Sequence, residues 1–247
     1  MKILCCIPAR FASTRLNGKL LFKINDKTVI QLVYEQVKKC ELISDIIVVT
    51  DNDAIKKEII KIGGKSVIVN DNCLNGTERI VNYLQQFNPE TDIIVNVQGD
   101  EPFINPKNID LCIQNYIDNS PDTRIKCSTL HYKMNVKNVG NRSRPKLVID
   151  RYNNILYCSR NIIPSSKNGT INSNYQYLGH IGVFVFDKKY LMNEYLENNS
   201  RCQLEEDIEW LKILEDGYKI NSVLVNDHER GIDTIRDYYY LTSKYGS

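Results

Sequence analysis

A polar turn with the sequence Gln-Gly-Asp-Glu-Pro directly follows the apolar segment 93–97 and contains Asp100. The apolar segment predicts a buried strand, so Asp100 would lie at the end of that strand. Hard cations such as Mg²⁺ take oxygen ligands and are usually held by one or two carboxylates together with substrate phosphates. Asp100 is therefore a candidate metal ligand, although Gly, Asp and Pro are also common in turns that bind nothing.

Three cations follow the first predicted strand, residues 2–7. Arg10, Arg15 and Lys19 all lie in the loop after it, among small residues that let backbone N–H groups approach an anion. Arginine offers a fork of donors that matches phosphate oxygens, and lysine offers a point charge. The loop contains neither the P-loop pattern nor the dinucleotide-binding glycine pattern. A triphosphate-binding loop of another kind is favoured over an ATPase or a dehydrogenase.

Composition narrows the class of protein. The 247 residues are 42% hydrophobic and 25% charged, with a formal net charge of +2, which is too small to indicate a polynucleotide-binding surface. The eight cysteines contain no Cys-x-x-Cys pair and indicate buried thiols in a reducing compartment. His131, His180 and His228 lack zinc-ligand spacing. With no apolar run of about 18 residues and no signal-peptide pattern, we expect a cytoplasmic chain that does not contact a membrane.

The elements that must position these residues alternate between short apolar strands and amphipathic helices, which is typical of a largely parallel sheet with helices on its faces. We find no linker between independent domains and no internal repeat. The expected strands are residues 2–7, 45–50, 66–69, 93–97, 126–132, 181–186 and 219–225, with a hairpin at 146–150 and 154–159; the expected helices are residues 29–40, 54–62, 77–87, 109–117, 188–196 and 204–215.

Five segments in this order resemble the motif set of the 3-deoxy-manno-octulosonate cytidylyltransferase (CMP-Kdo synthetase) family, and together they span nearly the whole chain. Each segment alone is weak evidence, but their order and spacing make chance similarity improbable. The segments are residues 7–16 (IPARFASTRL), 75–79 (NGTER), 96–102 (NVQGDEP), 179–182 (GHIG) and 231–234 (GIDT).

The resemblance implies a reaction in which CTP and an eight-carbon acidic sugar, Kdo, give CMP-Kdo and pyrophosphate with Mg²⁺ as cofactor. It implies an α/β, Rossmann-like nucleotidyltransferase fold over residues 1–247, with a mostly parallel central sheet and a smaller sugar-side and dimerisation lobe at about 120–185. It also implies a cytoplasmic homodimer in nucleotide-sugar and lipopolysaccharide biosynthesis, although no residue names the pathway.

The resemblance also carries roles onto matching residues. Asp100 and Asp233 match the metal-binding aspartates and, with Lys19 and Arg15, form the expected catalytic set. The expected nucleotide-binding residues are Ala9, Arg10, Ser13, Arg15, Lys19, Asp51, Arg79 and Gln98, and the expected sugar-binding residues are Gln98, Arg160, His180 and Glu209. Asp51 is alternatively a helix N-cap. The carboxylate of the sugar would pair with Arg160 or His180.

The chain departs from the family pattern beside the predicted sugar site. Residues 208–212 read Ile-Glu-Trp-Leu-Lys, where the family commonly has Leu-Glu-Gln-Leu-Arg, and Trp210 cannot reproduce the hydrogen bonds of an amide. Either Trp210 is a core residue of a helix, or the pocket accepts a related acidic sugar such as 8-amino-Kdo or a sialic-acid-like ulosonate. A non-catalytic nucleotide-binding protein is disfavoured because both aspartates and all three loop cations are present.

Overall fold

Strand β1 (Ile3–Ala9) is buried along its whole length in the computed structural model, which describes residues 1–13, 15–69, 72–197 and 200–246. It pairs in parallel with β4 (Asp45–Thr50) on one side and with β6 (Ile93–Val97) on the other, and β5 (Ser66–Ile68) pairs in parallel with β4. Strands covered on both faces are expected to be apolar throughout rather than alternating, as β1 is and as β6 is except at the buried Asn96. The carboxyl ends of these strands therefore lie along one edge of the sheet.

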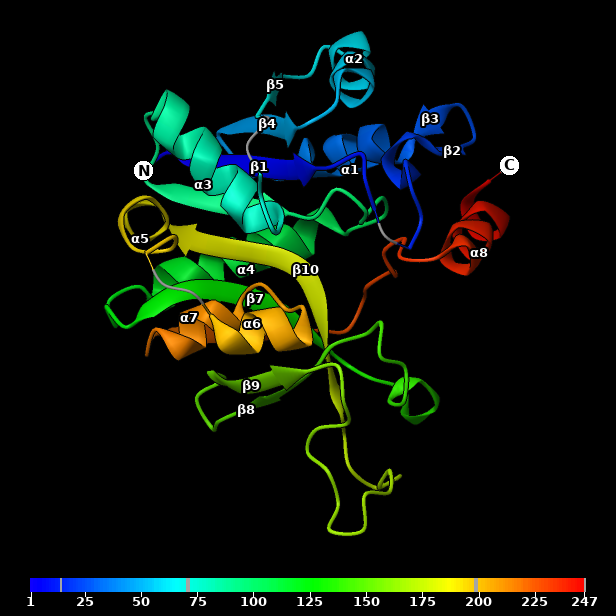
Figure 1. The fold of residues 1–247 in the computed structure, drawn as a ribbon, viewed down its shortest axis with the longest axis vertical. Helices are drawn as coiled ribbons and strands as arrows, with labels where there is room; N and C mark the ends of the chain where they lie inside the picture. Colours follow the sequence, from blue (N-terminus) through cyan, green and yellow to red (C-terminus); the bar gives the residue numbers. More distant parts are fainter. Residues whose placement is uncertain (14, 70–71, 198–199, 247) are drawn as a thin grey trace. The chain divides into compact units, whose positions relative to one another are not determined.

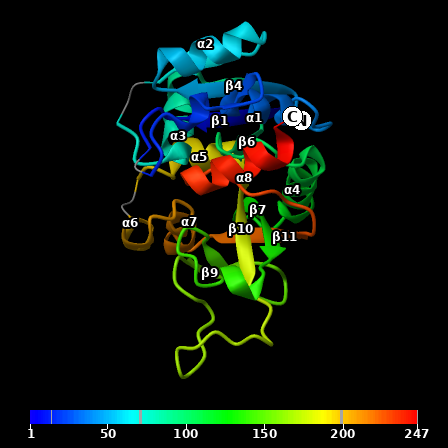
Figure 2. The ribbon, with the colours of Figure 1, turned by 90° about the vertical axis from the view of Figure 1, so that its right-hand side faces the viewer.

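Helices cover both faces of this sheet. Figures 1 and 2 show α3 (Gly76–Phe87) on one face of β1 and α1 (Val29–Val37) on the opposite face, with α2 (Asp53–Lys61) beside β4 and β5. Val29, Ile30, Val33 and Val37 of α1 recur at helical spacing and are fully buried, which is why this segment packs as a helix on the sheet.

The first of two compact units contains Met1–Asp110 and His228–Ser247, so the C-terminal helix belongs with the N-terminal sheet. Tyr245 of this helix stacks on Phe103 with ring centroids 3.9 Å apart. The unit also contains η1 (Lys19–Leu21), β2 (Lys23–Ile24), β3 (Lys27–Thr28), the start of α4 (Pro106–Asn119) and α8 (Ile235–Tyr245).

The second unit, Leu111–Asp227, contains a mixed sheet. Its strand β10 (Leu178–Asp187) runs antiparallel to β7 (Ile125–Lys133) and to β8 (Lys146–Ile149), while β11 (Lys219–Val225) is parallel to β7. The predicted hairpin forms from β8 and β9 (Ile155–Ser159). The remaining elements are η2 (Val136–Asn138), α5 (Lys188–Asn193), α6 (Arg201–Glu206) and α7 (Leu211–Glu215).

The α/β class and the mainly parallel sheet of the first unit confirm the fold prediction. The lobe expected at about 120–185 falls within the second unit, and a single functional domain over residues 1–247 stays a prediction. No helix of the described residues is long and apolar enough to span a membrane.

The predicted helix over residues 204–215 is wrong. The chain leaves α6 at Asp207, which has a φ of 50°, and resumes a helix only at Leu211. Aspartate tolerates this left-handed conformation because its short side chain can bond locally. Glu209 and Trp210 therefore lie in the turn between two short helices rather than on one long helix.

Candidate functional site

The loop after β1 is closed by backbone hydrogen bonds. Gly18 N donates to Phe11 O at 3.1 Å, and Gly18 adopts a φ of 67°, which favours glycine because a side chain is strained there. Phe11 N donates to Asp51 Oδ1 at 2.9 Å. Thr14, within the family-like segment, lies outside the described residues. The loop is thus anchored at the end of β4 and leads directly into Lys19.

Lys19 lies between two carboxylates. Its Nζ is 2.5 Å from Asp100 Oδ2 and 3.8 Å from Asp233 Oδ1, and it donates to the carbonyl oxygen of Ile232 at 2.7 Å. Arg15 donates to Asp233 Oδ1 at 2.8 Å. The Lys19 side chain is only 11% exposed, against 43% for Arg15. All four residues of the predicted catalytic set therefore lie together, and their roles stay predictions.

Close backbone approach joins the two aspartate-bearing segments. Ile232 N donates to Asp100 O at 2.8 Å. A Cβ on Gly231 would lie 3.1 Å from Asp100 O and 3.0 Å from Glu101 Oε1, so this position has little room for a side chain. The Gly-Ile-Asp-Thr segment is thereby held against the end of β6.

Electrostatics at this cluster favour a bound cation. Burial raises the pKa of Asp233, the nearby Asp100 carboxylate raises it further, and Lys19 and Arg15 oppose the rise. Two oxygen-donor side chains that repel one another gain from a cation between them. Lys19 and Arg15 supply that charge here, and a divalent cation with phosphate would supply it in a nucleotide complex.

Arg79 and Asp51 form a second ion pair, in which the arginine is buried and the aspartate is half-buried. Arg79 is 5% exposed; it donates to Asp51 Oδ2 at 3.0 Å and to Val69 O at 2.5 Å. Asp51 precedes the N-cap of α2, which is Asn52. The N-cap alternative for Asp51 is therefore wrong, because its carboxylate bonds Phe11 N and Arg79 instead.

The other predicted nucleotide-binding residues lie at the ends of β1 and β6. Ala9 is buried as the last residue of β1, Arg10 is exposed, and Ser13 is half-buried in the loop. Gln98 Nε2 donates to Asn96 Oδ1 at 3.4 Å. These positions agree with the general location of ligand sites at the carboxyl ends of parallel strands, and their nucleotide contacts stay predictions.

Arg160, in the second unit, caps the end of α6. Its Nε donates to Glu206 O at 2.7 Å, and its NH2 donates to Asp207 O at 2.6 Å and to Asp207 Oδ2 at 3.0 Å. A longer bond, 3.3 Å, joins NH1 to Arg142 O. A cation at a helix C-terminus satisfies carbonyl groups that lack partners within the helix. Most of the donors predicted for a sugar carboxylate are therefore engaged with the backbone.

The His180 ring is fixed by one hydrogen bond and two aromatic neighbours. The Thr129 hydroxyl donates to Val183 O at 2.6 Å, so it accepts at its 2.8 Å contact with His180 Nε2. This network assigns the proton of the neutral ring to Nε2 and leaves Nδ1 as an acceptor. Trp210 stacks on the ring with centroids 3.9 Å apart, and Phe184 does so at 5.0 Å.

Trp210 is a core residue, 7% exposed, as one of the two sequence interpretations proposed. Among the described residues its Nε1 has no nitrogen or oxygen acceptor, and the buried Cys158 thiol interacts with it. Glu209, the residue before it, is half-buried in the turn between α6 and α7, and its carbonyl oxygen accepts from the Tyr195 hydroxyl at 3.4 Å.

We expect the second unit to lose stability as the pH falls from 6.5 towards 4. Burial lowers the pKa of His131 from 6.5 to about 4; burial and then the neighbouring His131 lower that of His180 from 6.5 to about 3. Below pH 6.5 the unfolded chain binds protons that the folded unit does not, so the free energy of unfolding falls with pH. Urea unfolding at about pH 7 and about pH 5, followed by Trp210 fluorescence, measures the loss.

The variant His180→Gln is the control for this pH dependence. It keeps a donor for Thr129 and removes one of two titrating groups, so we expect it to reduce the slope between pH 5 and pH 6.5 by roughly half. A slope equal to that of the unmodified protein would contradict the assignment.

Sequence reasoning missed several groups that hold candidate residues within each unit. The Ile232 carbonyl oxygen, which accepts from Lys19, and the Thr129 hydroxyl leave no sequence signal because tertiary contacts alone define them. Thr234 and Asp237 leave one: the pattern Thr-x-x-Asp predicts a capping box at a helix N-terminus, and α8 begins there.

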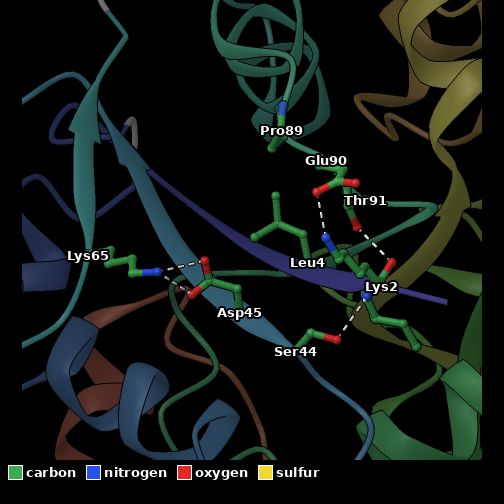
Figure 3. Close-up of a pocket in the computed structure, with 9 residues that line it drawn as sticks. Lys2, Leu4, Ser44, Asp45, Lys65, Pro89, Glu90 and Thr91 are labelled. Carbon is green, nitrogen blue, oxygen red and sulfur yellow. Dashed lines mark hydrogen bonds and ion pairs between the residues drawn. The ribbon is translucent and has the colours of Figure 1, made fainter.

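A cavity of about 460 Å³ lies in the first unit (Figure 3), and neither Asp100 nor Asp233 lines it. It is lined by Lys2, Leu4 and Asp45, at the amino ends of β1 and β4, and by Lys65 and Glu90. Lys65 pairs with Asp45 at 2.7 Å and Lys2 pairs with Glu90 at 2.5 Å, so these charges bind one another. Because ligands of parallel sheets bind at the carboxyl ends, we assign the chemistry to the Lys19 cluster.

Comparison with known proteins gives matches through both units. Residues 4–226 match the family model described as Cytidylyltransferase. The 3-deoxy-manno-octulosonate cytidylyltransferase of Protochlamydia amoebophila (strain UWE25) is 36% identical over 239 residues, which cover 96% of this chain and 91% of that protein. The enzyme of the same name from Zea mays is 36% identical over 231 residues, covering 94% and 76%.

Solved structures give the same result. A CMP:2-keto-3-deoxy-manno-octonic acid synthetase complexed with CTP matches this chain with a TM-score of 0.88 and 29% sequence identity, covering 99% of this chain and 98% of that one.

Proposed function

The chain belongs to the cytidylyltransferase family, and we propose that it transfers CMP from CTP to the anomeric hydroxyl of Kdo, with release of pyrophosphate. The 36% identity with the Protochlamydia enzyme over 96% of the chain is the observation that carries this conclusion. The convergence of Lys19 and Arg15 on Asp100 and Asp233 supplies the chemistry that the reaction needs.

In this reaction the anomeric oxygen forms a bond to the α-phosphorus of CTP. The bond from that phosphorus to the oxygen bridging to the β-phosphorus breaks, the hydroxyl loses its proton, and pyrophosphate leaves. Such a displacement depends on positioning and on stabilising negative charge more than on covalent participation by the protein. Lys19 and Arg15 would bind phosphate oxygens as the charge on the leaving pyrophosphate grows.

The two aspartates fit Mg²⁺, which is part of the proposal. Their carboxylates are hard oxygen donors, lie near the same ammonium group and are 27% and 33% exposed, so both are accessible to solvent. When bound, the cation would polarise the α-phosphate and lower the pKa of a coordinated hydroxyl. Asp100 and Asp233 would hold it, while Lys19 moves its contact to phosphate.

For the sugar, we propose contacts from Gln98, Arg160, His180 and Glu209. The tautomer of His180 limits which group of the sugar it would bind. Its Nδ1 is a hydrogen-bond acceptor, so the ring suits a sugar hydroxyl rather than a carboxylate. The sugar carboxylate would then pair with Arg160, whose NH1 makes one long bond, 3.3 Å to a backbone oxygen, within the part of the chain that the structure describes.

Burial of Trp210 favours Kdo over the alternative sugars. A tryptophan that lined the sugar pocket would be an argument for an altered substrate, whereas Trp210 is 7% exposed and stacks on His180. The amino-substituted and sialic-acid-like sugars remain the second candidates, and they are arms of the test below.

We further propose a cytoplasmic homodimer that supplies lipopolysaccharide biosynthesis. Exposed apolar side chains on the second unit support a subunit interface: Tyr152 is 72% exposed and Leu156 62% exposed. The eight cysteines are all free thiols, which agrees with a reducing compartment.

The test is pyrophosphate release with Mg²⁺ and CTP, measured separately with Kdo, 8-amino-Kdo and a sialic acid. We expect turnover on Kdo and a loss of about 10³-fold or more in Asp100→Ala, because removing a ligand forfeits several kcal/mol of charge stabilisation. The control Asp26→Ala changes an exposed aspartate between β2 and β3 and should be fully active. Turnover on another sugar alone would replace Kdo, and no turnover on any would overturn the function.

A further inference from the structure

Asp233 is held on its N-terminal side by Ile232. The backbone N–H of Ile232 donates to Asp100 O at 2.8 Å, and its carbonyl oxygen accepts from Lys19 Nζ at 2.7 Å. Its side chain is fully buried. The backbone N–H and carbonyl oxygen of Ile232 are therefore both hydrogen-bonded to residues of the Lys19 cluster. These bonds fix the position of the backbone just before Asp233.

On the C-terminal side, Asp233 is followed by a capping box. Thr234 N and Thr234 Oγ1 donate to Asp237 Oδ2 at 2.9 and 2.7 Å, and Asp237 N donates back to Thr234 Oγ1 at 3.3 Å. Thr234 is the N-cap of α8. A capping box fixes the dihedral angles at the start of a helix, and here the residue before that start is Asp233.

Arg230 closes the segment around Asp233. Its guanidinium lies 3.6 Å from Asp237 Oδ1 and 3.9 Å from the centre of the Tyr240 ring. Arg230, before Asp233, and Thr234, after it, thus both contact the carboxylate of Asp237. The Asp237 side chain is 16% exposed, so this joint is shielded from solvent more than a surface ion pair is.

The helix that carries Asp237 is itself anchored to the first unit. Tyr238 donates from its hydroxyl to Lys23 O at 2.7 Å and packs edge-on against Phe22 with centroids 5.2 Å apart. Tyr245 at the other end stacks on Phe103. Because α8 is anchored in this way, the capping box formed by Asp237 and Thr234 holds the backbone next to Asp233 in a fixed position.

We propose that Asp237 is a positioning residue that sets the orientation of the Asp233 carboxylate for the divalent cation, an inference that rests on the proposed function. It touches neither substrate nor metal and acts through Thr234. Partners that orient a metal ligand are commonly worth 10- to 100-fold in metal affinity. A residue that only stabilises α8 would leave that affinity unchanged in the folded protein.

The test is direct binding of Mn²⁺, followed by electron paramagnetic resonance, to the full chain with CTP present. We expect Asp237→Ala to weaken Mn²⁺ binding about 10- to 100-fold. Asp237→Asn keeps an oxygen acceptor for Thr234 and loses only the partner of Arg230, so it should bind within about 3-fold of the unmodified protein.

The matched control is Gln31→Ala, which removes the corresponding third residue of the capping box of α1, in the same unit. It should bind Mn²⁺ normally even if its melting temperature falls as much as that of Asp237→Ala. Equal Mn²⁺ affinity in Asp237→Ala and Gln31→Ala would overturn the positioning role, as would Mn²⁺ binding that Asp233→Ala leaves unchanged. Failure of the proposed function has a different signature: Mn²⁺ binds but no sugar releases pyrophosphate from CTP.

Discussion

Replacing Lys19 by Met is expected to lower the turnover number about 10²- to 10³-fold, the usual cost of removing one preorganised donor from a developing charge. Methionine keeps much of the length and apolar volume of the lysine stem, which is almost buried, but removes the ammonium group that contacts Asp100 and the Ile232 carbonyl oxygen. Steady-state pyrophosphate release at saturating CTP and sugar measures the effect.

The control for this variant is Lys23→Met. Lys23 is exposed on β2, four residues after Lys19. Its hydrogen bond with Tyr238 involves its backbone carbonyl oxygen, which the substitution retains. It should retain full turnover. If Lys19→Met raised only the KM for CTP and left the turnover number unchanged, Lys19 would bind the ground state and transition state equally, and its catalytic role would be wrong.

The same variant has an opposite expected effect on metal affinity. Without Lys19, the carboxylates of Asp100 and Asp233 lose their nearest shared cation, so a divalent cation should bind more tightly in the absence of nucleotide. A gain in Mn²⁺ affinity together with a loss of turnover would separate the two roles of charge at this cluster.

Strand positions were predictable because burial on both faces leaves a simple sequence pattern. The segments 45–50 and 219–225 were predicted with the bounds that β4 and β11 have. Because β1, β4 and β6 are parallel, their carboxyl ends meet at one edge, so the approach of Asp100 to the loop after β1 follows from the order of these strands along the chain. The proximity of Asp233 came only from the family resemblance.

The break between α6 and α7 was not predictable from periodicity. Apolar residues continue at helical spacing through it, and what ends α6 is Asp207 in a left-handed conformation with Arg160 bound to its last carbonyls. Arg160 lies 47 residues earlier in the chain than Asp207. A local pattern contains no information on such a distant partner, and this is also why the Arg79–Asp51 pair went unrecognised.

Arg79→Met is expected to lower the free energy of unfolding by about 1–3 kcal/mol, because it leaves the Val69 carbonyl oxygen and the half-buried Asp51 carboxylate without their partner. Arg79 joins the first turn of α3 to Val69 and to Asp51, which in turn holds Phe11 at the start of the basic loop. Chemical denaturation followed by circular dichroism measures the change. Lys65→Met removes an exposed pair with Asp45 and should leave the free energy of unfolding nearly unchanged.

A double-mutant cycle with Asp51→Asn distinguishes this structural role from the predicted contact with nucleotide. Asparagine keeps an acceptor for Phe11 N but removes the charge that faces Arg79, so the two substitutions should be coupled by roughly 0.5–3 kcal/mol rather than additive. Additive effects on stability, together with a raised KM for CTP in Arg79→Met, would mean that the main role of Arg79 is to bind the nucleotide. The burial of Arg79, at 5% exposure with two short bonds already made, is why we expect the coupling instead.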